Sequence, residues 1–258
     1  MSEVSDWMSA NCLKLNHNKT EFIIFRPRHR AFIPEDFPIQ LGNTTLTPAP
    51  HVTNLGVTQD GCLTMEHQVN KVTRACYHNI RNIGKIWNNI TTDACRTLVQ
   101  ATITSRLDYA NVLLYGLLST LTSRLQRVQN AAGRLISRTR KHDHITPVMI
   151  QLHWLPVEYR PHYKVLLYAY KAVPGTAPSY ICDLISKQQP TRTLRSASRS
   201  LLSVPRARTA TYGNRSFRTA APTLWNNLPE KLKQVESESQ FKKQLKTHLF
   251  RLAYGEHL

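Results

Sequence analysis

Residues 105–171 constrain the fold more than any other stretch, because their centre carries two stripes of helical spacing. Apolar residues recur at intervals of three and four, as on the buried face of an amphipathic helix. They are Leu121, Leu125, Val128, Ala132, Leu135 and Ile136. A second stripe holds Arg124, Arg127, Arg134 and Arg138. At about 100° per residue these arginines fall within an arc of roughly 80° beside the apolar stripe. The pattern predicts a helix that packs along one face and presents fixed positive charge beside it.

Residues 64–87 repeat this design. Their apolar positions, again at intervals of three and four, are Met65, Val69, Val72, Cys76, Ile80, Ile83 and Trp87. The accompanying cationic stripe consists of Lys71, Arg74, His78, Arg81 and Lys85. Thr64 can cap this helix at its N-terminus. A third helix over residues 93–107 is expected to pack between the two.

The two basic stripes indicate a binding surface for a polyanion. No acidic residue lies between Glu66 and Asp93, or between Asp108 and Asp143, whereas an ordinary solvated helix face mixes both signs of charge. The net charge of +18 at pH 7 favours nucleic acid first and an acidic membrane surface second. Cations on successive turns lie ~5 Å apart along the axis, which suits contacts to the phosphates of a strand. The alternative is a solvated helix face without a ligand.

The first 60 residues are expected to be small and α+β. We predict a helix over residues 2–13, a buried strand over 21–25, a hairpin over 38–46 around Gly42-Asn43, and a strand over 52–57 closed by Gly56. These elements are too few for a good core of their own. The whole chain is thus predicted to be α+β and predominantly α-helical. Its expected regions are 1–60, a helical domain over 61–150, and a basic C-terminal region over 151–258.

The C-terminal region combines helices with a basic segment. Helices are predicted over residues 159–172 and after a capping box of Ser237 and Gln240, with Phe241, Leu245, Leu249 and Leu252 on the buried face. The residues between Asp183 and Glu230 include no acid. They carry Lys187, Arg192, Arg195, Arg199, Arg206, Arg208, Arg215 and Arg218, interleaved with Tyr212, Phe217 and Trp225. The pattern fits an RNA-binding surface, or a loop whose aromatic residues anchor it.

Several kinds of site are not indicated. His142, His144 and His153 lack a nearby cysteine and have a single close carboxylate, Asp143, so no zinc site is expected. The five cysteines are scattered and form no CxxC pair, which is typical of reduced thiols in an intracellular protein, nuclear or cytoplasmic. No apolar run reaches the ~20 residues of a membrane span. The N-terminus is not a signal peptide, and it starts as if in the middle of a domain.

Seven strings, in consistent order, resemble one protein family. They are NCLKLNHNKTEFIIF, VTNLGVTQDGCL, SRLDYANVLLYG, LQRVQNAAGRLI, HITPVMIQLHWLPVEYR, APSYICDLI and GNRSF followed by APTLWNNLP. Together they resemble the C-terminal part of reverse transcriptases, the RNA-directed DNA polymerases of LINE-type (non-LTR) retrotransposons, of the jockey-like kind. One departure is Ala110, where the family string would have cysteine; we expect it to be harmless to the fold.

The resemblance implies a role for each region. Residues 1–60 would be a remnant of the palm, in which Lys19 matches a lysine suggested to protonate the leaving pyrophosphate. Leu55, Gly56 and Val57 match the hairpin that grips the primer. The helices that follow would form the thumb, whose two basic stripes would face an RNA–DNA hybrid. The implied partners are therefore RNA, DNA or their hybrid.

The sequence does not supply the carboxylates that polymerase chemistry needs. Two Mg²⁺ ions ~3.5–4 Å apart require close acidic ligands. The only adjacent acidic pair is Glu35-Asp36, in a proline-bounded loop, and no YxDD-like motif is present. We therefore expect a truncated reverse transcriptase that binds nucleic acid without polymerising, has no cofactor of its own, and would need Mg²⁺ only as part of an intact polymerase. The alternatives are a host-retained nucleic-acid-binding or interaction module, and a cationic structural protein without a specific ligand.

Overall fold

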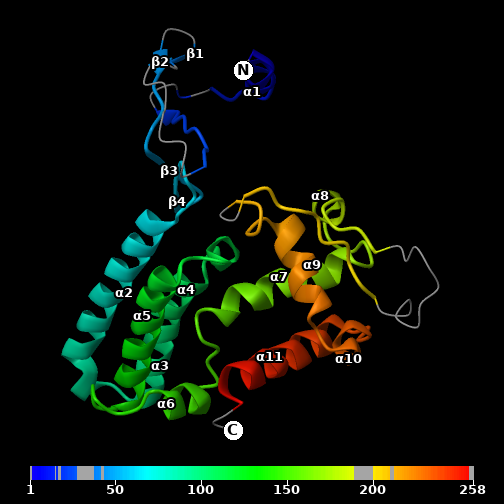
Figure 1. Ribbon diagram of the computed structural model, residues 1–258. Helices are drawn as coiled ribbons and strands as arrows, with labels where there is room; N and C mark the ends of the chain where they lie inside the picture. The colour runs from blue at the N-terminus through cyan, green and yellow to red at the C-terminus, as the bar shows by residue number, and fades with distance from the viewer. Residues whose placement is uncertain are drawn as a thin grey trace. The chain divides into compact units, whose positions relative to one another are not determined.

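The computed structural model describes residues 2–14, 16, 19–27, 38–41, 44–188, 200–209 and 212–255. The chain forms two compact units, Met1–Gln68 and Val69–Leu258. Its described part is α+β and predominantly α-helical, with strands only in the smaller unit, as predicted (Figure 1).

The smaller unit begins with helix α1 (Ser2–Ala10) and continues to a first β-hairpin. Strands β1 (Ile39–Leu41) and β2 (Thr44–Leu46) pair antiparallel, with Ile39 opposite Leu46. This confirms the hairpin predicted over 38–46, although Gly42 and Asn43 lie outside the described residues. The helix predicted over 2–13 is confirmed as well, but it ends at Ala10.

A second hairpin replaces the single strand predicted over residues 52–57. Strands β3 (His51–Asn54) and β4 (Val57–Asp60) pair antiparallel, with Asn54 opposite Val57. The chain reverses at Leu55 and Gly56, which both have positive φ, 46° and 79°. Two successive residues with positive φ are the requirement of the two-residue hairpin turn that matches the twist of the strands. The predicted strand is confirmed over residues 52–54, which lie in β3, but its continuation to Val57 was wrong because Leu55 gave no sign of this conformation.

The buried strand predicted over residues 21–25 was also wrong. Phe22 forms one isolated bridge, parallel to Pro48, and accepts a hydrogen bond from the amide of Ala49 at 2.7 Å. Phe25 at the end of this stretch is exposed. An apolar run becomes a strand only where a partner strand lies along it, and the described residues supply one bridge.

The Asp60 carboxylate organises the entry to the long helix α2 (Glu66–Ile86). Oδ1 accepts hydrogen bonds from the amides of Cys62 at 3.1 Å and Thr64 at 3.0 Å, and Oδ2 accepts one from Met65 at 2.9 Å. Thr64 Oγ1 donates to Oδ2 and accepts from the amide of Glu66 at 3.3 Å. Thr64 therefore accepts from the first amide of the helix, in line with its predicted capping role, while Asp60 holds the amides of the loop that precedes it.

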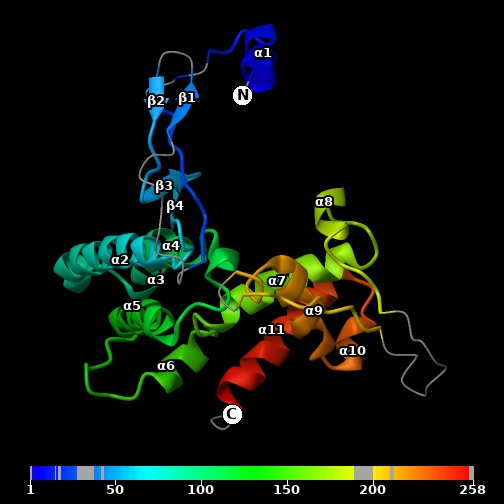
Figure 2. The ribbon, with the colours of Figure 1, turned by 45° about the horizontal axis from the view of Figure 1, so that its top comes forward.

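The larger unit contains a first core built by three helical segments (Figure 1, Figure 2). They are α2, the segment α3 (Thr92–Val99), η3 (Gln100–Thr104) and α4 (Ser105–Asp108), and α5 (Ser119–Ser137). The buried residues are those of the predicted apolar stripes, joined by Cys95, Val99, Ile103 and Leu107 from the third segment. The amphipathic pattern therefore identified this core.

The middle of the third segment is a turn of π-helix. The amide of Ser105 donates to the carbonyl of Gln100, five residues earlier, instead of four as in an α-helix. Cys76 Sγ and the Asn79 side chain of α2 bond the carbonyls of Ile103 and Thr102, while Cys95 Sγ bonds that of Leu135 in α5. The segment contacts both neighbours, as predicted.

The second core joins α7 (Tyr159–Ala172), α9 (Phe217–Asn226), α10 (Glu230–Lys233) and α11 (Glu238–Tyr254), which lie together in both views (Figure 1, Figure 2). Trp225 and Phe241 are fully buried there. Leu245 and Leu249 are buried as predicted, but Leu252 is 59% exposed and Tyr254 is buried instead. The predicted capping box does not form: Ser237 is the N-cap, but its side chain makes no capping hydrogen bond.

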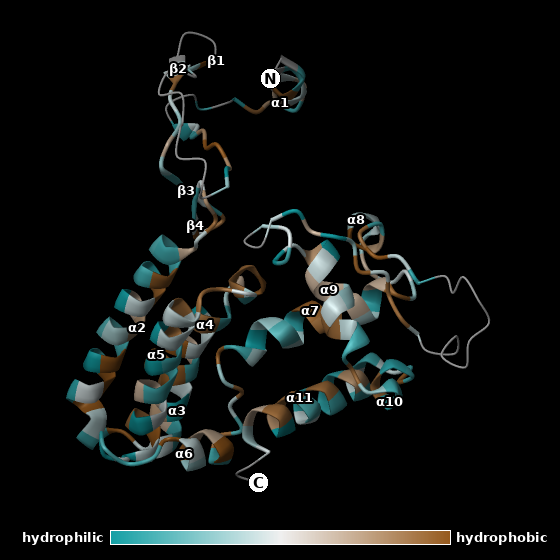
Figure 3. Ribbon diagram, viewed as in Figure 1, coloured by the Kyte–Doolittle hydropathy of each residue, from teal (hydrophilic) through white to brown (hydrophobic). Residues whose placement is uncertain are grey.

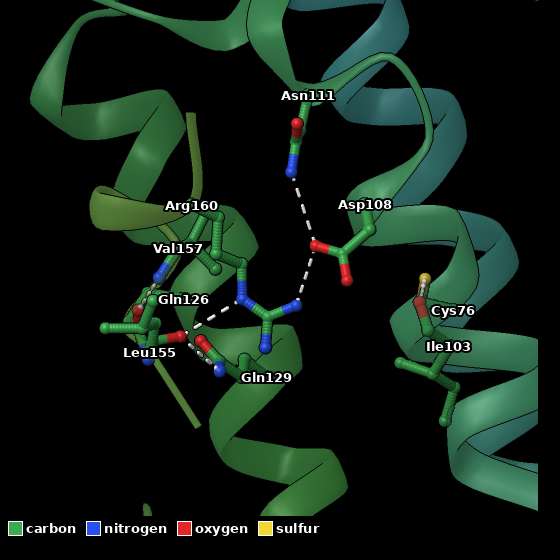
Figure 4. A network of polar contacts seen from close by, with 9 residues as sticks. All are labelled: Cys76, Ile103, Asp108, Asn111, Gln126, Gln129, Leu155, Val157 and Arg160. Atoms are coloured by element: carbon green, nitrogen blue, oxygen red, sulfur yellow. Dashed lines mark hydrogen bonds and ion pairs between the residues drawn. The ribbon is translucent and has the colours of Figure 1, made fainter. Parts of the chain in front are cut away.

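The corner at Trp154–Pro156 connects the two cores. It follows α6 (Thr146–Gln151), and its Leu155 carbonyl accepts hydrogen bonds from Gln129 Nε2 at 2.9 Å and Arg160 Nε at 3.0 Å. Gln126 Oε1 accepts from the amide of Val157 at 2.9 Å. Two glutamines of α5 thus hold the backbone that leads into α7 (Figure 4). The short helix η4 (Asn111–Leu114) and α8 (Ser179–Cys182) complete the larger unit, with η2 (Trp87–Asn89) after α2.

Candidate nucleic-acid interface

The cationic stripe of α2 forms the clearest candidate interface. Lys71, Arg74, Arg81 and Lys85, here called the α2 face, are all exposed. Opposite them, Val69, Cys76 and Ile83 are buried in the first core. Figure 3 shows hydrophilic and hydrophobic residues alternating along this helix. One face of the helix therefore packs against the core, and the other exposes its four permanent charges to solvent.

No acidic side chain neutralises the α2 face within the part of the chain that the structure describes. The ion pairs there involve Arg96, Arg160, Lys171, Lys233 and Lys242. His78, which lies on the same stripe, shares a hydrogen bond of 2.9 Å with Asn82 of its own helix. The α2 face thus keeps its full positive charge available to an external anion.

Helix α5 contributes two further cations, of which Arg124 contacts α2. Arg124 donates from Nη2 to Asn70 Oδ1 of α2. Since Asn70 precedes Arg74 by one helical turn, the Arg124 guanidinium lies beside the α2 face. Arg127 is exposed, and among the described residues it has no hydrogen-bond or ionic partner. The candidate interface therefore consists of the α2 face with Arg124 and Arg127.

The other two arginines of the α5 stripe make internal contacts. Arg134 donates to the carbonyls of Arg140 at 3.3 Å and Asp143 at 3.1 Å. Arg138 is not on the helix face, contrary to the prediction: it is the C-cap, with φ of 60°, and its guanidinium lies 4.3 Å from the ring centroid of Trp87. A residue at that conformation ends the helix, so the 100° spacing no longer applies to it.

The residues assigned by resemblance to the palm and primer grip lie in the smaller unit. Lys19 is exposed. Leu55 and Gly56 form the tip of the β3–β4 hairpin, where the Leu55 side chain is 83% exposed, and Val57 is buried at the start of β4.

In the basic C-terminal segment, Trp225 and Arg215 make internal contacts, whereas Lys187, Arg206, Arg208 and Arg218 are exposed. Trp225 is buried and donates from Nε1 to the carbonyl of Ser200 at 2.9 Å. Arg215 donates from Nε to the carbonyl of Tyr115 and from Nη2 to that of Leu113, both at 2.9 Å. These contacts favour the interpretation of anchoring residues for both side chains. Arg192, Arg195 and Arg199 lie outside the described residues.

The structure brings no candidate metal ligands together. His142 and His144 are exposed, and the His153 ring lies 6.1 Å from that of Phe250. No group of three or more His, Cys, Asp or Glu side chains that could hold a metal ion occurs among the described residues. Glu35 and Asp36, the adjacent acidic pair, lie outside them.

The sequence patterns did not predict the structural roles of two residues. Asp60 and Arg160 both act through backbone carbonyls or amides whose positions only the fold sets. Asp60 stands beside Gly61 just before the helix, a weak turn signal that could have pointed to a capping carboxylate. For Arg160 the sequence offers no comparable signal.

No helix in the described ranges is long and apolar enough to cross a bilayer. No family model, curated protein or solved structure matches this chain.

Proposed function

We propose that this chain binds the backbone of a nucleic-acid duplex, as the template–primer-holding part of a non-LTR retrotransposon reverse transcriptase, and does not polymerise by itself. The observation that carries the binding proposal is the α2 face: four exposed permanent cations on one side of the helix, with no ionic partner among the described residues. The family assignment rests on the seven strings in the sequence.

The geometry of the interface favours phosphates over base edges. Lys71 and Arg74, and likewise Arg81 and Lys85, lie ~5 Å apart along the axis of α2, and the two pairs are separated by about two turns. These distances are on the scale of the phosphates along a strand. Contacts to phosphates position a duplex without reading its sequence. We therefore expect RNA–DNA hybrid and duplex DNA to bind with little dependence on sequence.

Salt-dependent binding measurements test the proposal. Six phosphate contacts, from the α2 face with Arg124 and Arg127, give a slope of roughly −5 in a plot of log K against log salt for a duplex. The variant K71Q/R74Q/R81Q/K85Q should weaken binding and reduce the magnitude of the slope by about 3 to 4. Fluorescence anisotropy with a labelled hybrid duplex measures both quantities.

A matched control separates a defined interface from general charge. The variant R218Q/K231Q/K243Q/R251Q also removes two arginines and two lysines, but from exposed positions on α9, α10 and α11. It should retain most of the affinity. Equal losses in the two variants would show that the chain attracts anions only by its net charge, the behaviour of a cationic protein without a specific ligand.

A primer-extension assay tests the second part of the proposal. The purified chain, with a primed RNA template, nucleoside triphosphates and Mg²⁺, should incorporate no nucleotide. Templated incorporation would show that polymerase chemistry resides in these residues and would overturn the assignment of a purely binding role.

A further inference from the structure

A pocket of about 580 Å³ lies between the helices of the two cores in the larger unit. Its walls come from the α3–α4 segment, from the corner at residues 151–155, from α7 and from α11. The volume falls within the range of small-molecule sites. It is large enough for a nucleotide or the end of a strand, but not for a duplex.

The pocket is lined by four cations from three separate helices. Arg96 comes from α3, Arg160 and Lys164 from α7, and Lys246 from α11. The acidic residue among its described lining is Asp108. Its carboxylate is already engaged, because Oδ1 accepts from Arg160 Nη1 at 2.8 Å and from Asn111 Nδ2 at 3.3 Å. Arg96 forms an exposed ion pair with Asp93 at 3.8 Å, whereas Lys164 and Lys246 have no ionic partner among the described residues. These two lysines leave excess positive charge at the pocket.

Arg160 is fixed in the wall, whereas the other three cations are adaptable. Its side chain is 11% exposed and is held on both sides, by Asp108 and by the Leu155 carbonyl (Figure 4). Arg96, Lys164 and Lys246 are exposed residues whose long side chains can reach a ligand. A rigid interior cation with flexible cations around the opening suits a ligand that carries several negative charges on one end.

Uncharged groups complete the lining. Gln100, Thr104 and Gln151 can donate hydrogen bonds to phosphoryl oxygens, and Trp154 and Tyr163 offer ring surfaces. The set of arginine, lysine and amide donors matches a phosphoryl group better than a single carboxylate, because each phosphoryl group has several acceptor oxygens and more negative charge.

We propose that this pocket binds the phosphoryl groups of a nucleotide through Arg96, Lys164 and Lys246. The nucleotide is either free, as a nucleoside triphosphate, or the 5′-phosphorylated end of a strand. The site differs from the α2 face and does not depend on duplex binding there.

Calorimetric titration with inorganic triphosphate tests the proposal on the full chain. The variant R96Q/K164Q/K246Q should bind it at least about tenfold more weakly than the original chain, since charge-assisted hydrogen bonds are lost. The variant K231Q/K243Q/R251Q removes one arginine and two lysines as well, from exposed positions that belong neither to the pocket nor to the α2 face, and should leave triphosphate binding within about twofold. Equal weakening in both variants would overturn the proposal.

Two further measurements exclude unfolding and identify the ligand's source. The variant R96K/K164R/K246R keeps the three positive charges and should still bind triphosphate. If this variant and R96Q/K164Q/K246Q both lose triphosphate binding with unchanged thermal unfolding, the charge at the pocket is not the cause of binding and the proposal fails. A nucleoside triphosphate competes for the pocket if the ligand is free. An oligonucleotide with a 5′-phosphate binds better than its 5′-hydroxyl counterpart if the ligand is a strand end. If R96Q/K164Q/K246Q binds inorganic triphosphate, nucleoside triphosphate and a 5′-phosphorylated oligonucleotide as tightly as the original chain does, no such site exists.

Variants of the pocket and of the α2 face keep this proposal separate from duplex binding. R96Q/K164Q/K246Q should leave the salt slope for the hybrid duplex unchanged, and K71Q/R74Q/K85Q should reduce it. In K71Q/R74Q/K85Q, loss of duplex binding with unchanged triphosphate binding would support both proposals. In R96Q/K164Q/K246Q, loss of duplex binding with unchanged triphosphate binding would overturn this one.

Discussion

Arg160 Nη1 donates to Asp108 Oδ1 at 2.8 Å and so joins α7 to the end of α4, 52 residues earlier in the chain. The two partners differ in solvent access: the Arg160 side chain is 11% exposed and that of Asp108 is 41% exposed. The guanidinium also donates to the Leu155 carbonyl. Because these contacts connect elements from both cores, the ion pair helps to fix how the larger unit is assembled.

We predict that D108A and R160A each lower the free energy of unfolding of the larger unit by about 1–3 kcal/mol. Their double-mutant cycle should give a coupling of about 1 kcal/mol. D108N should cost less than D108A, because the amide oxygen can still accept from the guanidinium. Urea denaturation followed by circular dichroism measures these values. Additive effects of D108A and R160A would show that the contact contributes nothing of its own.

The start of α2 should respond to acid through Asp60. Partial burial raises the pKa of its carboxyl, but hydrogen bonds from Thr64, Met65 and Cys62 outweigh burial and hold the pKa below the ordinary value of 3.8. A carboxyl with a depressed pKa stabilises the fold above its unfolded-state pKa, and this stabilisation is lost as the pH falls through the folded-state pKa. We therefore expect the 57–66 region to be stable at neutral pH and to loosen in acid below about pH 4.

NMR titration of the Thr64 and Met65 amides measures this transition, whose midpoint should lie below 3.8. D60N should remove the transition and leave these amides less protected at neutral pH. A midpoint at or above the ordinary value would contradict the assignment of Asp60 as the capping acceptor.

Two glycines in helices should respond oppositely to alanine. A Cβ on Gly133 of α5 would collide with Met149 Cε of α6, whereas a Cβ on Gly84 of α2 would meet no atom within 4 Å. Met149 Cε ends a flexible side chain, but Met149 is only 2% exposed, so we predict that G133A destabilises the fold by about 1 kcal/mol through overpacking. G84A should stabilise it by about 0.5–1 kcal/mol, because alanine favours the helix. Thermal unfolding compares the two, and stabilisation by G133A would refute the close packing of α5 on α6.

The smaller unit should exchange its amide hydrogens faster than the larger one. Its strands form two separate two-stranded hairpins, and such hairpins are marginally stable in water. The helices of the larger unit surround two buried clusters. Hydrogen exchange followed by mass spectrometry should therefore show weaker protection in residues 44–60 than in residues 69–172. Equal protection in the two ranges would contradict this difference.

The helical core was predictable because its signal is repeated. Each turn of α2 and α5 places an apolar residue on the same side, so Val69, Cys76, Leu125 and Val128 all indicate one face. The strands of the smaller unit were less predictable. Residues 21–25 have a strand's composition, but whether a strand forms depends on a partner far away in the sequence.

The candidate interface was predicted more closely for α2 than for α5. Spacing alone selects exposed positions, and on α2 those positions have no competing partner among the described residues. On α5, Arg134 finds the carbonyls of a following loop and Arg138 finds the ring of Trp87. Such contacts depend on where a loop and a neighbouring helix lie, and the periodicity of the sequence holds no information on those positions.

The π-turn at Gln100–Thr104 makes the number of residues in this helix important. Cys95, Val99, Ile103 and Leu107 are spaced by four, and in a uniform α-helix each such step would rotate the next side chain by about 40°. One wider turn offsets part of this rotation and keeps all four in the core. Losing a single residue there would turn everything after it by about 100°. Asp108 would then face away from Arg160. The contact that joins the two cores therefore depends on the number of residues in this segment as well as on which residues they are.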